Sequence, residues 1–228
     1  MEWLARNLQT VRARMAEAAR RSGRSAEAVR LVAVSKTFPA EMIRAAAHCG
    51  QLCFGENRVQ EAAEKMPMLE DLNLEWHLIG HLQSNKAKTA VNLFHVIQTV
   101  DTSKLARRLD RFAEAAGKRV PCLVEVNVAE EPQKAGVRPG EVEPLIRDIL
   151  TLPNLRVLGL MAIPPLLGCS EAVRPHFRRL RELRDGIEQR LEVALPELSM
   201  GMSADFETAI EEGATLVRVG TAIFGDRS

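Results

Sequence analysis

The sequence predicts an α/β protein built as a single TIM-type (β/α)8 barrel with an extra helix at its N-terminus. Eight short apolar segments are typical of buried strands, and longer segments with helical periodicity separate them. No linker rich in Pro, Gly or Ser, no internal repeat and no low-complexity stretch divides the 228 residues. We therefore expect one domain over residues 1–228.

The expected elements alternate along the chain. An amphipathic helix begins at the N-terminus and precedes the first strand. The strands are expected at 31–35, 52–54, 75–79, 95–99, 122–126, 157–160, 197–199 and 215–219. The helices between them are expected at 39–48, 57–65, 84–91, 102–116, 139–150, 172–191 and 204–212. Helix-start signals support these boundaries: Pro39 suits a first helical position, and Thr102 and Ser203 suit N-caps.

Composition excludes several classes of function. Basic and acidic residues nearly cancel, giving a formal net charge of +1, so the chain lacks the basic character of a nucleic-acid binder or a membrane-surface protein. The arginine-rich stretches 12–24 and 174–190 are interpreted as solvated helix faces. No segment reads as a signal peptide or a membrane span, so a cytoplasmic protein is expected.

Cysteine and histidine spacing predicts no metal site. The four cysteines, Cys49, Cys53, Cys122 and Cys169, form no C-x-x-C pair, and free thiols suit a reducing cytosol. His77 and His81 are four residues apart, but His77 lies in an expected strand, so the two should not share a ligand as helical neighbours would. His81 could line the mouth of the barrel or be structural.

Polar residues at the ends of the expected strands are the candidates for function, because the loops after the strands build the site in this fold. Lys36 directly follows the first strand, where partial desolvation frees an amine for Schiff-base formation with an aldehyde. Gly220 and Thr221 follow the last strand and open a helical turn, which can hold a phosphate. An amine and a phosphate cradle together indicate pyridoxal 5'-phosphate (PLP) as the cofactor.

Six segments carry a family resemblance: 34–37 (VSKT), 54–61 (FGENRVQE), 76–86 (WHLIGHLQSNK), 159–162 (GLMA), 198–203 (LSMGMS) and 217–225 (VRVGTAIFG). In order and spacing, the chain resembles the pyridoxal phosphate homeostasis protein family, PLP-binding proteins of fold type III related to the barrel domain of alanine racemase.

The resemblance implies a role for each matching residue. Lys36 would hold PLP as a Schiff base, Ser203, Gly220 and Thr221 would hold its phosphate, and Arg218 would face the pyridine nitrogen. Asn57 and Met161 would form walls of the pocket. From the residues alone, Arg218 could instead pair with a buried carboxylate such as Glu125. Lys86 could bind the phosphate of another B6 vitamer or be a solvated helix residue.

Two functions follow from the resemblance. The first is intracellular PLP homeostasis, in which the protein buffers PLP and supplies it to apoenzymes. The second is amino-acid racemisation, which in this fold type uses a tyrosine opposite the lysine and a second domain. The sequence contains no tyrosine and ends at Ser228, close after the phosphate turn, so we expect the first function. Without the domain that forms the racemase dimer, a monomer is expected.

Overall fold

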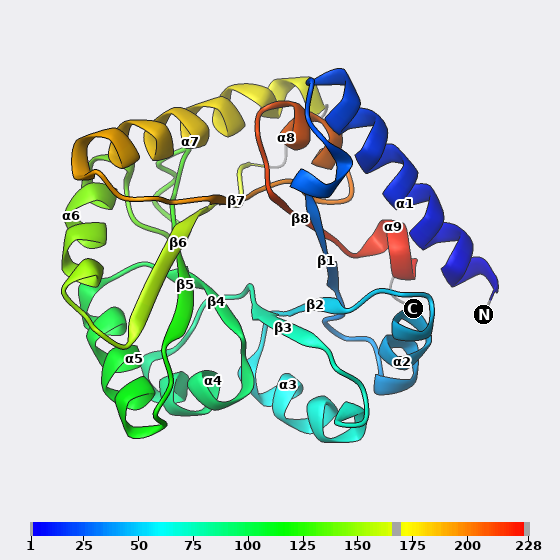
Figure 1. Ribbon diagram of the computed structural model, residues 1–228, viewed down its shortest axis with the longest axis horizontal. Helices are drawn as coiled ribbons and strands as arrows, with labels where there is room; N and C mark the ends of the chain where they lie inside the picture. Colours follow the sequence, from blue (N-terminus) through cyan, green and yellow to red (C-terminus); the bar gives the residue numbers. More distant parts are fainter. Residues whose placement is uncertain (1, 166–169, 226–228) are drawn as a thin grey trace.

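The computed structural model describes residues 2–165 and 170–225 and shows eight parallel strands closed into a barrel. The strands run in sequence order around the barrel, and β8 pairs with β1 to close it (Figure 1). Their bounds are β1 Arg30–Val34, β2 Cys53–Glu56, β3 Glu75–Leu78, β4 Val96–Val100, β5 Val120–Glu125, β6 Leu155–Met161, β7 Glu197–Ser199 and β8 Leu216–Val219. All eight predicted strands are confirmed, with ends that move by one or two residues.

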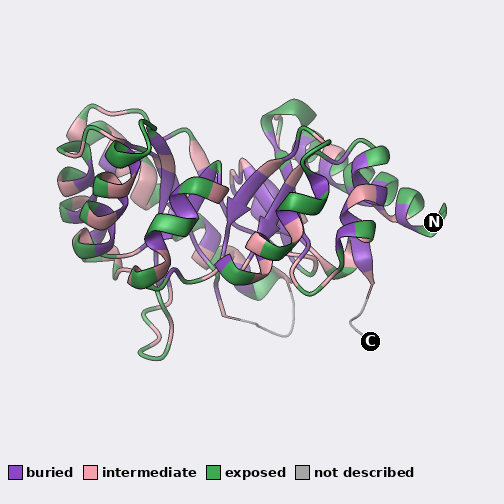
Figure 2. Ribbon diagram, turned by 90° about the horizontal axis from the view of Figure 1, so that it is seen from below, coloured by how far each residue is buried: buried purple, intermediate pink, exposed green. Residues whose placement is uncertain are grey.

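Helices surround the barrel, with their buried residues facing inward (Figure 2). The α-helices are α1 Glu2–Arg21, α2 Ala40–His48, α3 Val59–Lys65, α4 Ala87–Leu93, α5 Ser103–Ala115, α6 Pro139–Leu150, α7 Ser170–Leu191, α8 Phe206–Glu211 and α9 Thr221–Phe224. Three 3₁₀ turns complete the order: η1 Ala26–Ala28, η2 Met66–Leu69 and η3 Ser84–Lys86. No helix within the described ranges is long and apolar enough to cross a membrane.

The predicted N-terminal helix is α1, which packs against α8 and α9 on the outside of the barrel (Figure 1). Leu4, Leu8, Val11 and Met15 are buried at helical spacing along one face of it. The Asn7 amide donates a hydrogen bond of 3.0 Å to the Ile223 carbonyl. Through this contact α1 supports the turn that follows β8.

Two of the three predicted helix starts need correction. Thr102 does cap α5, since its hydroxyl accepts from the Leu105 amide. Pro39 is the N-cap of α2 rather than its first residue. Asp205, not Ser203, precedes α8, because the chain from 201 to 204 folds back toward β8 before that helix begins. The cysteine Cys169 lies outside the described residues.

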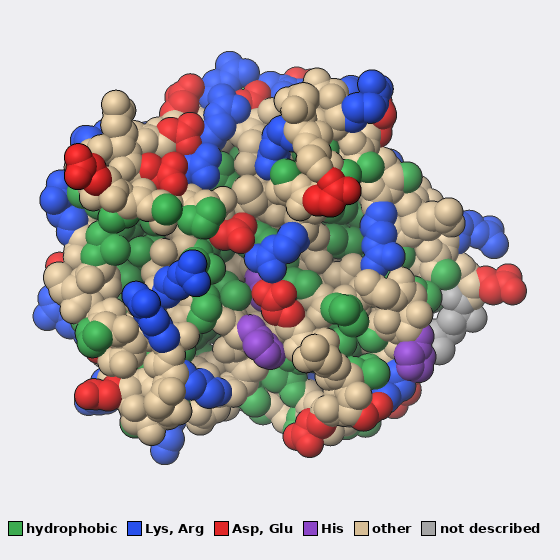
Figure 3. Space-filling view, viewed as in Figure 1, with side chains coloured by type: hydrophobic (Ala, Val, Ile, Leu, Met, Phe, Trp, Pro, Cys, Tyr) green, Lys and Arg blue, Asp and Glu red, His purple; other side chains and the backbone are tan. Residues whose placement is uncertain are grey.

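The interior of the barrel contains both an apolar cluster and buried polar side chains. Val32, Leu123, Met161 and Leu216 form a small buried cluster inside the barrel, separate from the larger core between strands and helices. Charged residues occupy the N-terminal end, where Arg30 contacts Glu75 at 3.3 Å and Glu197 at 3.1 Å. The space-filling view shows charged side chains of both signs near the centre of the face it presents (Figure 3).

Candidate functional site

The sheet register brings the predicted site residues together at the C-terminal ends of the strands. Lys36 follows β1, and Asn57 follows the neighbouring β2, in which Gly55 pairs with Val34. On the other side, Val219 of β8 pairs with Ala33, so Gly220 reaches the level of Val34. Adjacent strands lie about 4.8 Å apart, so these three residues share one edge of the mouth.

Backbone amides and a hydroxyl converge after β8 to form a cradle suited to an anion. The amides of Gly220 and Ala222 both lie 3.3 Å from Ser203 Oγ. Thr221, whose side chain is exposed, is the first residue of α9 and stands between them. A phosphate at this turn would meet main-chain donors and two hydroxyl groups, so the phosphate-binding roles of Ser203, Gly220 and Thr221 stay a prediction that this geometry allows.

Gly201 determines where Ser203 lies. Its backbone has φ +92°, and a Cβ there would stand 2.6 Å from the Ala209 Cβ on α8. Only glycine therefore allows the loop after β7 to pack this closely on α8. The Asp205 carboxylate then accepts a hydrogen bond from the Met202 amide, which fixes the loop that carries Ser203.

Arg218 is buried inside the barrel beneath this cradle. Its guanidinium donates to Ser199 Oγ at 2.7 Å and to the Ala162 carbonyl at 2.8 Å. Burial lowers the pKa of Arg218 to about 10, against the opposing effect of Glu125 and Asp205, so the side chain remains a cation at neutral pH. The Glu125 partner considered from the sequence acts through its charge, while the hydrogen bonds go to Ser199 and Ala162.

Glu125 is a buried carboxyl group whose Oε2 atom has no hydrogen-bond partner within the described residues. Burial, and to a lesser extent the charge of Asp101, raise the pKa of Glu125 to about 7, although Arg218 opposes this shift. Near neutral pH the group is therefore divided between its acid and carboxylate forms. An unsatisfied oxygen and a raised pKa are both typical of functional sites.

A chain of buried hydrogen bonds runs from Arg218 through the barrel to the opposite end. Ser199 donates to Gln98 Oε1 at 2.6 Å, Gln98 Nε2 lies 2.6 Å from His77 Nδ1, and His77 Nε2 lies 2.8 Å from Glu75 Oε1. An arginine can only donate, so Ser199 accepts from Arg218 and donates its own proton to Gln98. The Gln98 amide nitrogen then donates to His77 Nδ1. His77 therefore carries its proton on Nε2. Gln98 and Ser199 were not predicted from the sequence, although a polar side chain within an apolar segment was a signal for each.

A second cluster fixes the backbone on both sides of Lys36. Ser35 Oγ donates to Glu56 Oε1 at 2.7 Å, and Lys65 Nζ contacts the Ser35 carbonyl at 3.0 Å and Glu56 Oε1 at 3.1 Å. The Thr37 amide donates to the Glu61 carboxylate. Thr37 has φ +69°, an unfavourable conformation for a β-branched residue that this cluster holds in place. Lys36 is thus presented from a rigid support.

Asn57 and Met161 occupy different depths of the site. Asn57 is half-buried, and its Oδ1 has no partner among the described residues. Its backbone lies against Gly80, where a Cβ would stand 2.2 Å from the Asn57 carbonyl oxygen. Met161 is fully buried in the cluster inside the barrel, so it forms part of the floor beneath the mouth.

A polar cavity of about 580 Å³ adjoins Asn57 at the rim of the site. Basic side chains from Arg58, His81 and Lys86 line it, together with Gln60 and Gln83. His81 is exposed, with Nδ1 3.7 Å from Asp101 Oδ2. His81 therefore lies at the rim of the barrel mouth, which is one of the two positions considered from the sequence. The half-buried Lys86 lines the same cavity.

The arrangement fits PLP by two observations on the structure. The amides at the β8–α9 turn converge on one hydroxyl, as a phosphate cradle requires, and a buried cation lies below that turn. Lys36 comes from the adjacent strand with a fixed backbone. The fold and these residues indicate a class of barrel proteins that carry an amine and an anion-binding turn at the same end of the barrel.

Comparison with known proteins identifies the family. The sequence model of the family "Alanine racemase, N-terminal domain" matches residues 6–228. The pyridoxal phosphate homeostasis protein of Aquifex aeolicus is 49% identical over 220 residues, which are 96% of this chain and 96% of that protein. The Escherichia coli K12 protein of the same name is 42% identical, covering 100% and 98%. The chain belongs to the pyridoxal phosphate homeostasis protein family.

Solved structures agree with this assignment. PipY of Synechococcus elongatus PCC7942, determined with PLP bound, superposes with a TM-score of 0.87 at 39% identity, covering 97% of this chain and 100% of PipY. Alanine racemase of Clostridium difficile 630 superposes with a TM-score of 0.75 at 12% identity, covering 100% of this chain and 57% of the racemase. At that identity the racemase shows a shared fold alone.

Proposed function

We propose that this protein binds PLP at the C-terminal mouth of the barrel, holds it as a Schiff base on Lys36, and buffers or supplies it inside the cell. The observation that carries the proposal is the position of Lys36 just after β1, the strand next to the β8–α9 cradle. The names of the relatives and the PLP bound to PipY support the same cofactor.

Each site residue has a part in holding the cofactor. The amides of Gly220 and Ala222, with the hydroxyls of Ser203 and Thr221, would receive the phosphate in the cradle. Asn57 would contact the ring from its edge. Met161, which lies in the buried cluster, would close the pocket from below.

Arg218 favours a carrier over a catalyst. When bound, PLP acts as an electron sink, and its strength in that role depends on a protonated pyridine nitrogen. Arg218 remains a cation at neutral pH, so it would donate to the ring nitrogen and leave it unprotonated. Its hydrogen bonds to Ser199 and Ala162 hold the guanidinium in one orientation. Strong carbanion chemistry is therefore disfavoured.

The absence of tyrosine from the sequence also supports the carrier function. A racemase removes an α-proton on one face and returns it on the other, so it needs an acid or base opposite the lysine. The tyrosine used for this purpose in racemases of the fold type is not available here. We propose a monomer in the cytoplasm that exchanges PLP, and other phosphorylated B6 vitamers, with transient apoenzyme acceptors.

Borohydride reduction of the PLP-loaded protein tests the attachment site. Reduction makes the lysine linkage permanent, and peptide mapping by mass spectrometry should find the cofactor mass on Lys36. The Lys36→Ala variant should lose the absorption of the bound aldehyde, and Lys88→Ala, an exposed lysine on α4, should keep it. A label found on another lysine, or an unchanged spectrum in Lys36→Ala, would refute the assignment.

A further inference from the structure

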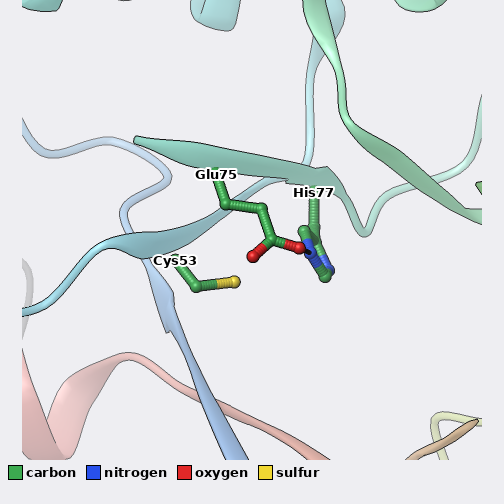
Figure 4. A group of neighbouring side chains, drawn as sticks. All are labelled: Cys53, Glu75 and His77. Atoms are coloured by element: carbon green, nitrogen blue, oxygen red, sulfur yellow. Dashed lines mark hydrogen bonds and ion pairs between the residues drawn. The ribbon is translucent and has the colours of Figure 1, made fainter. Parts of the chain in front are cut away.

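Three potential metal ligands lie together at the N-terminal end of the barrel, opposite the PLP mouth. The ligand atoms of Cys53, Glu75 and His77 are all within 4.8 Å of one another. Cys53 on β2 is paired with Glu75 on β3, and His77 follows two residues later. Alternation along a strand places all three side chains on the inner face, where they point to one another (Figure 4).

The sulfur, nitrogen and oxygen donors form a set that suits zinc. Protein ligands bind Zn²⁺ at about 2.0 to 2.3 Å in a tetrahedron, so neighbouring ligand atoms stand about 3.5 Å apart. The present separations, from 2.8 Å to at most 4.8 Å, bracket that spacing. His77 Nε2 is already 2.8 Å from Glu75 Oε1, and a cation between them would replace this hydrogen bond.

The charges around the cluster leave room for a divalent cation. Arg30 lies between Glu75 and Glu197 and neutralises one of the two carboxylates. Binding of the ion would release the Cys53 thiol proton to solvent, against the burial that raises the pKa of this thiol to about 12. The thiolate and the remaining carboxylate would then supply two negative charges, which a divalent ion would balance.

His77 also has the outer contact that a metal-binding histidine needs. Its Nδ1 faces the side chain of Gln98 at 2.6 Å. With the ion on Nε2, the ring proton would move to Nδ1 and the Gln98 amide would turn to present its oxygen. Ser199 Oγ would then accept from Gln98 Nε2 as well as from Arg218, and its own proton would turn away from Gln98. Such an outer hydrogen bond fixes the ring, and its loss typically weakens metal binding 10- to 100-fold.

A route for the ion exists from solvent. Cys53 is half-buried and lines a cavity of about 430 Å³ formed with α1 and the turn before β2. Glu75 is partly exposed on the same end of the barrel. We propose that Cys53, Glu75 and His77 bind one divalent transition-metal ion of the zinc class, with the fourth position open to water.

Cobalt titration of the full-length protein tests the proposal directly. A Co²⁺ ion bound to a thiolate gives a charge-transfer absorption that exposed carboxylates and histidines cannot give. We expect this band at one ion per chain, with displacement by Zn²⁺. Cys53→Ser should abolish the band and weaken Zn²⁺ binding at least tenfold, and Gln98→Leu should weaken it 10- to 100-fold.

Cys49→Ser is the matched control, since Cys49 is also half-buried and lies four residues before Cys53. It should keep both the band and the affinity. Glu75→Gln, which retains the side-chain shape, gives a second test if Cys53→Ser fails to fold by circular dichroism. The proposal is overturned if the wild-type protein shows no thiolate band, or if Cys53→Ser and Glu75→Gln bind Zn²⁺ as tightly as the wild-type protein.

Discussion

The buried carboxyl group of Glu125 makes the stability of the cofactor-free protein depend on pH in a direction that is unusual for an acid. Its pKa rises from an ordinary value of 4.5 to about 7, chiefly because burial disfavours the charged form. The folded protein therefore holds this proton over a pH range in which the unfolded chain has lost it. Replacing Glu125 with Gln mimics the protonated state at every pH.

The magnitude follows from the pKa difference. A tenfold change in proton affinity is worth about 1.4 kcal/mol, so a rise from 4.5 to about 7 corresponds to about 3 kcal/mol. Below pH 4.5 Glu125 is protonated in both the folded and the unfolded protein, so it does not lower the free energy of unfolding. Between pH 4.5 and pH 7 the destabilisation by Glu125 grows, and above pH 7 it reaches its full value. Glu125→Gln should match the wild type near pH 4 and be about 3 kcal/mol more stable at pH 8.

Urea denaturation of both proteins between pH 4 and pH 8 measures this difference. The control is Glu64→Gln, an exposed residue on α3, for which the free energy of unfolding should follow that of the wild type across the range. If Glu125→Gln shows the same pH dependence as the wild type, or is less stable at pH 8, then Glu125 does not carry the proton that its surroundings imply.

Three further substitutions test the supports of the site. Lys65→Met leaves the fully buried Glu56 without its cation, and the free energy of unfolding by urea should fall by about 3 kcal/mol; an unchanged value would contradict the cluster around Lys36. Gly80→Ala forces a Cβ against the Asn57 carbonyl and should cost about 2 to 3 kcal/mol by the same assay, whereas Gly140→Ala on α6, where a Cβ meets open space, should not be destabilising. Ser203→Ala should weaken PLP binding about tenfold in equilibrium dialysis, and an unchanged affinity would remove Ser203 from the cradle.

The sequence predicted the barrel well because its signal is repeated eight times. Each strand is a short apolar segment, and the buried patterns of β1, β4 and β5 match that expectation. A parallel sheet then requires crossover helices, and the intervening segments were long enough to supply them. The strand ends moved by one or two residues, since hydrogen bonding to neighbouring strands, rather than hydropathy, decides them.

The site was only partly predictable. Lys36 and Gly220 could be placed at the mouth of the barrel because each follows an apolar segment. The contacts of Ser203 could not, because they depend on the chain returning to β8 before α8 begins. Nor does any local pattern show that Gln98 and Ser199, which are far apart in the sequence, hydrogen-bond each other inside the barrel. The Cys53 cluster likewise arises from strand pairing.

The most direct test of the carrier function is the exchange of amino-acid α-protons in deuterated water by the PLP-loaded protein. On the proposal that Arg218 would leave the ring nitrogen unprotonated, and with no tyrosine in the sequence, exchange should be no faster than with free PLP, with Lys36→Ala as the control. Exchange well above that of free PLP, and lost in Lys36→Ala, would show a working acid and base at the mouth and would contradict the proposed carrier.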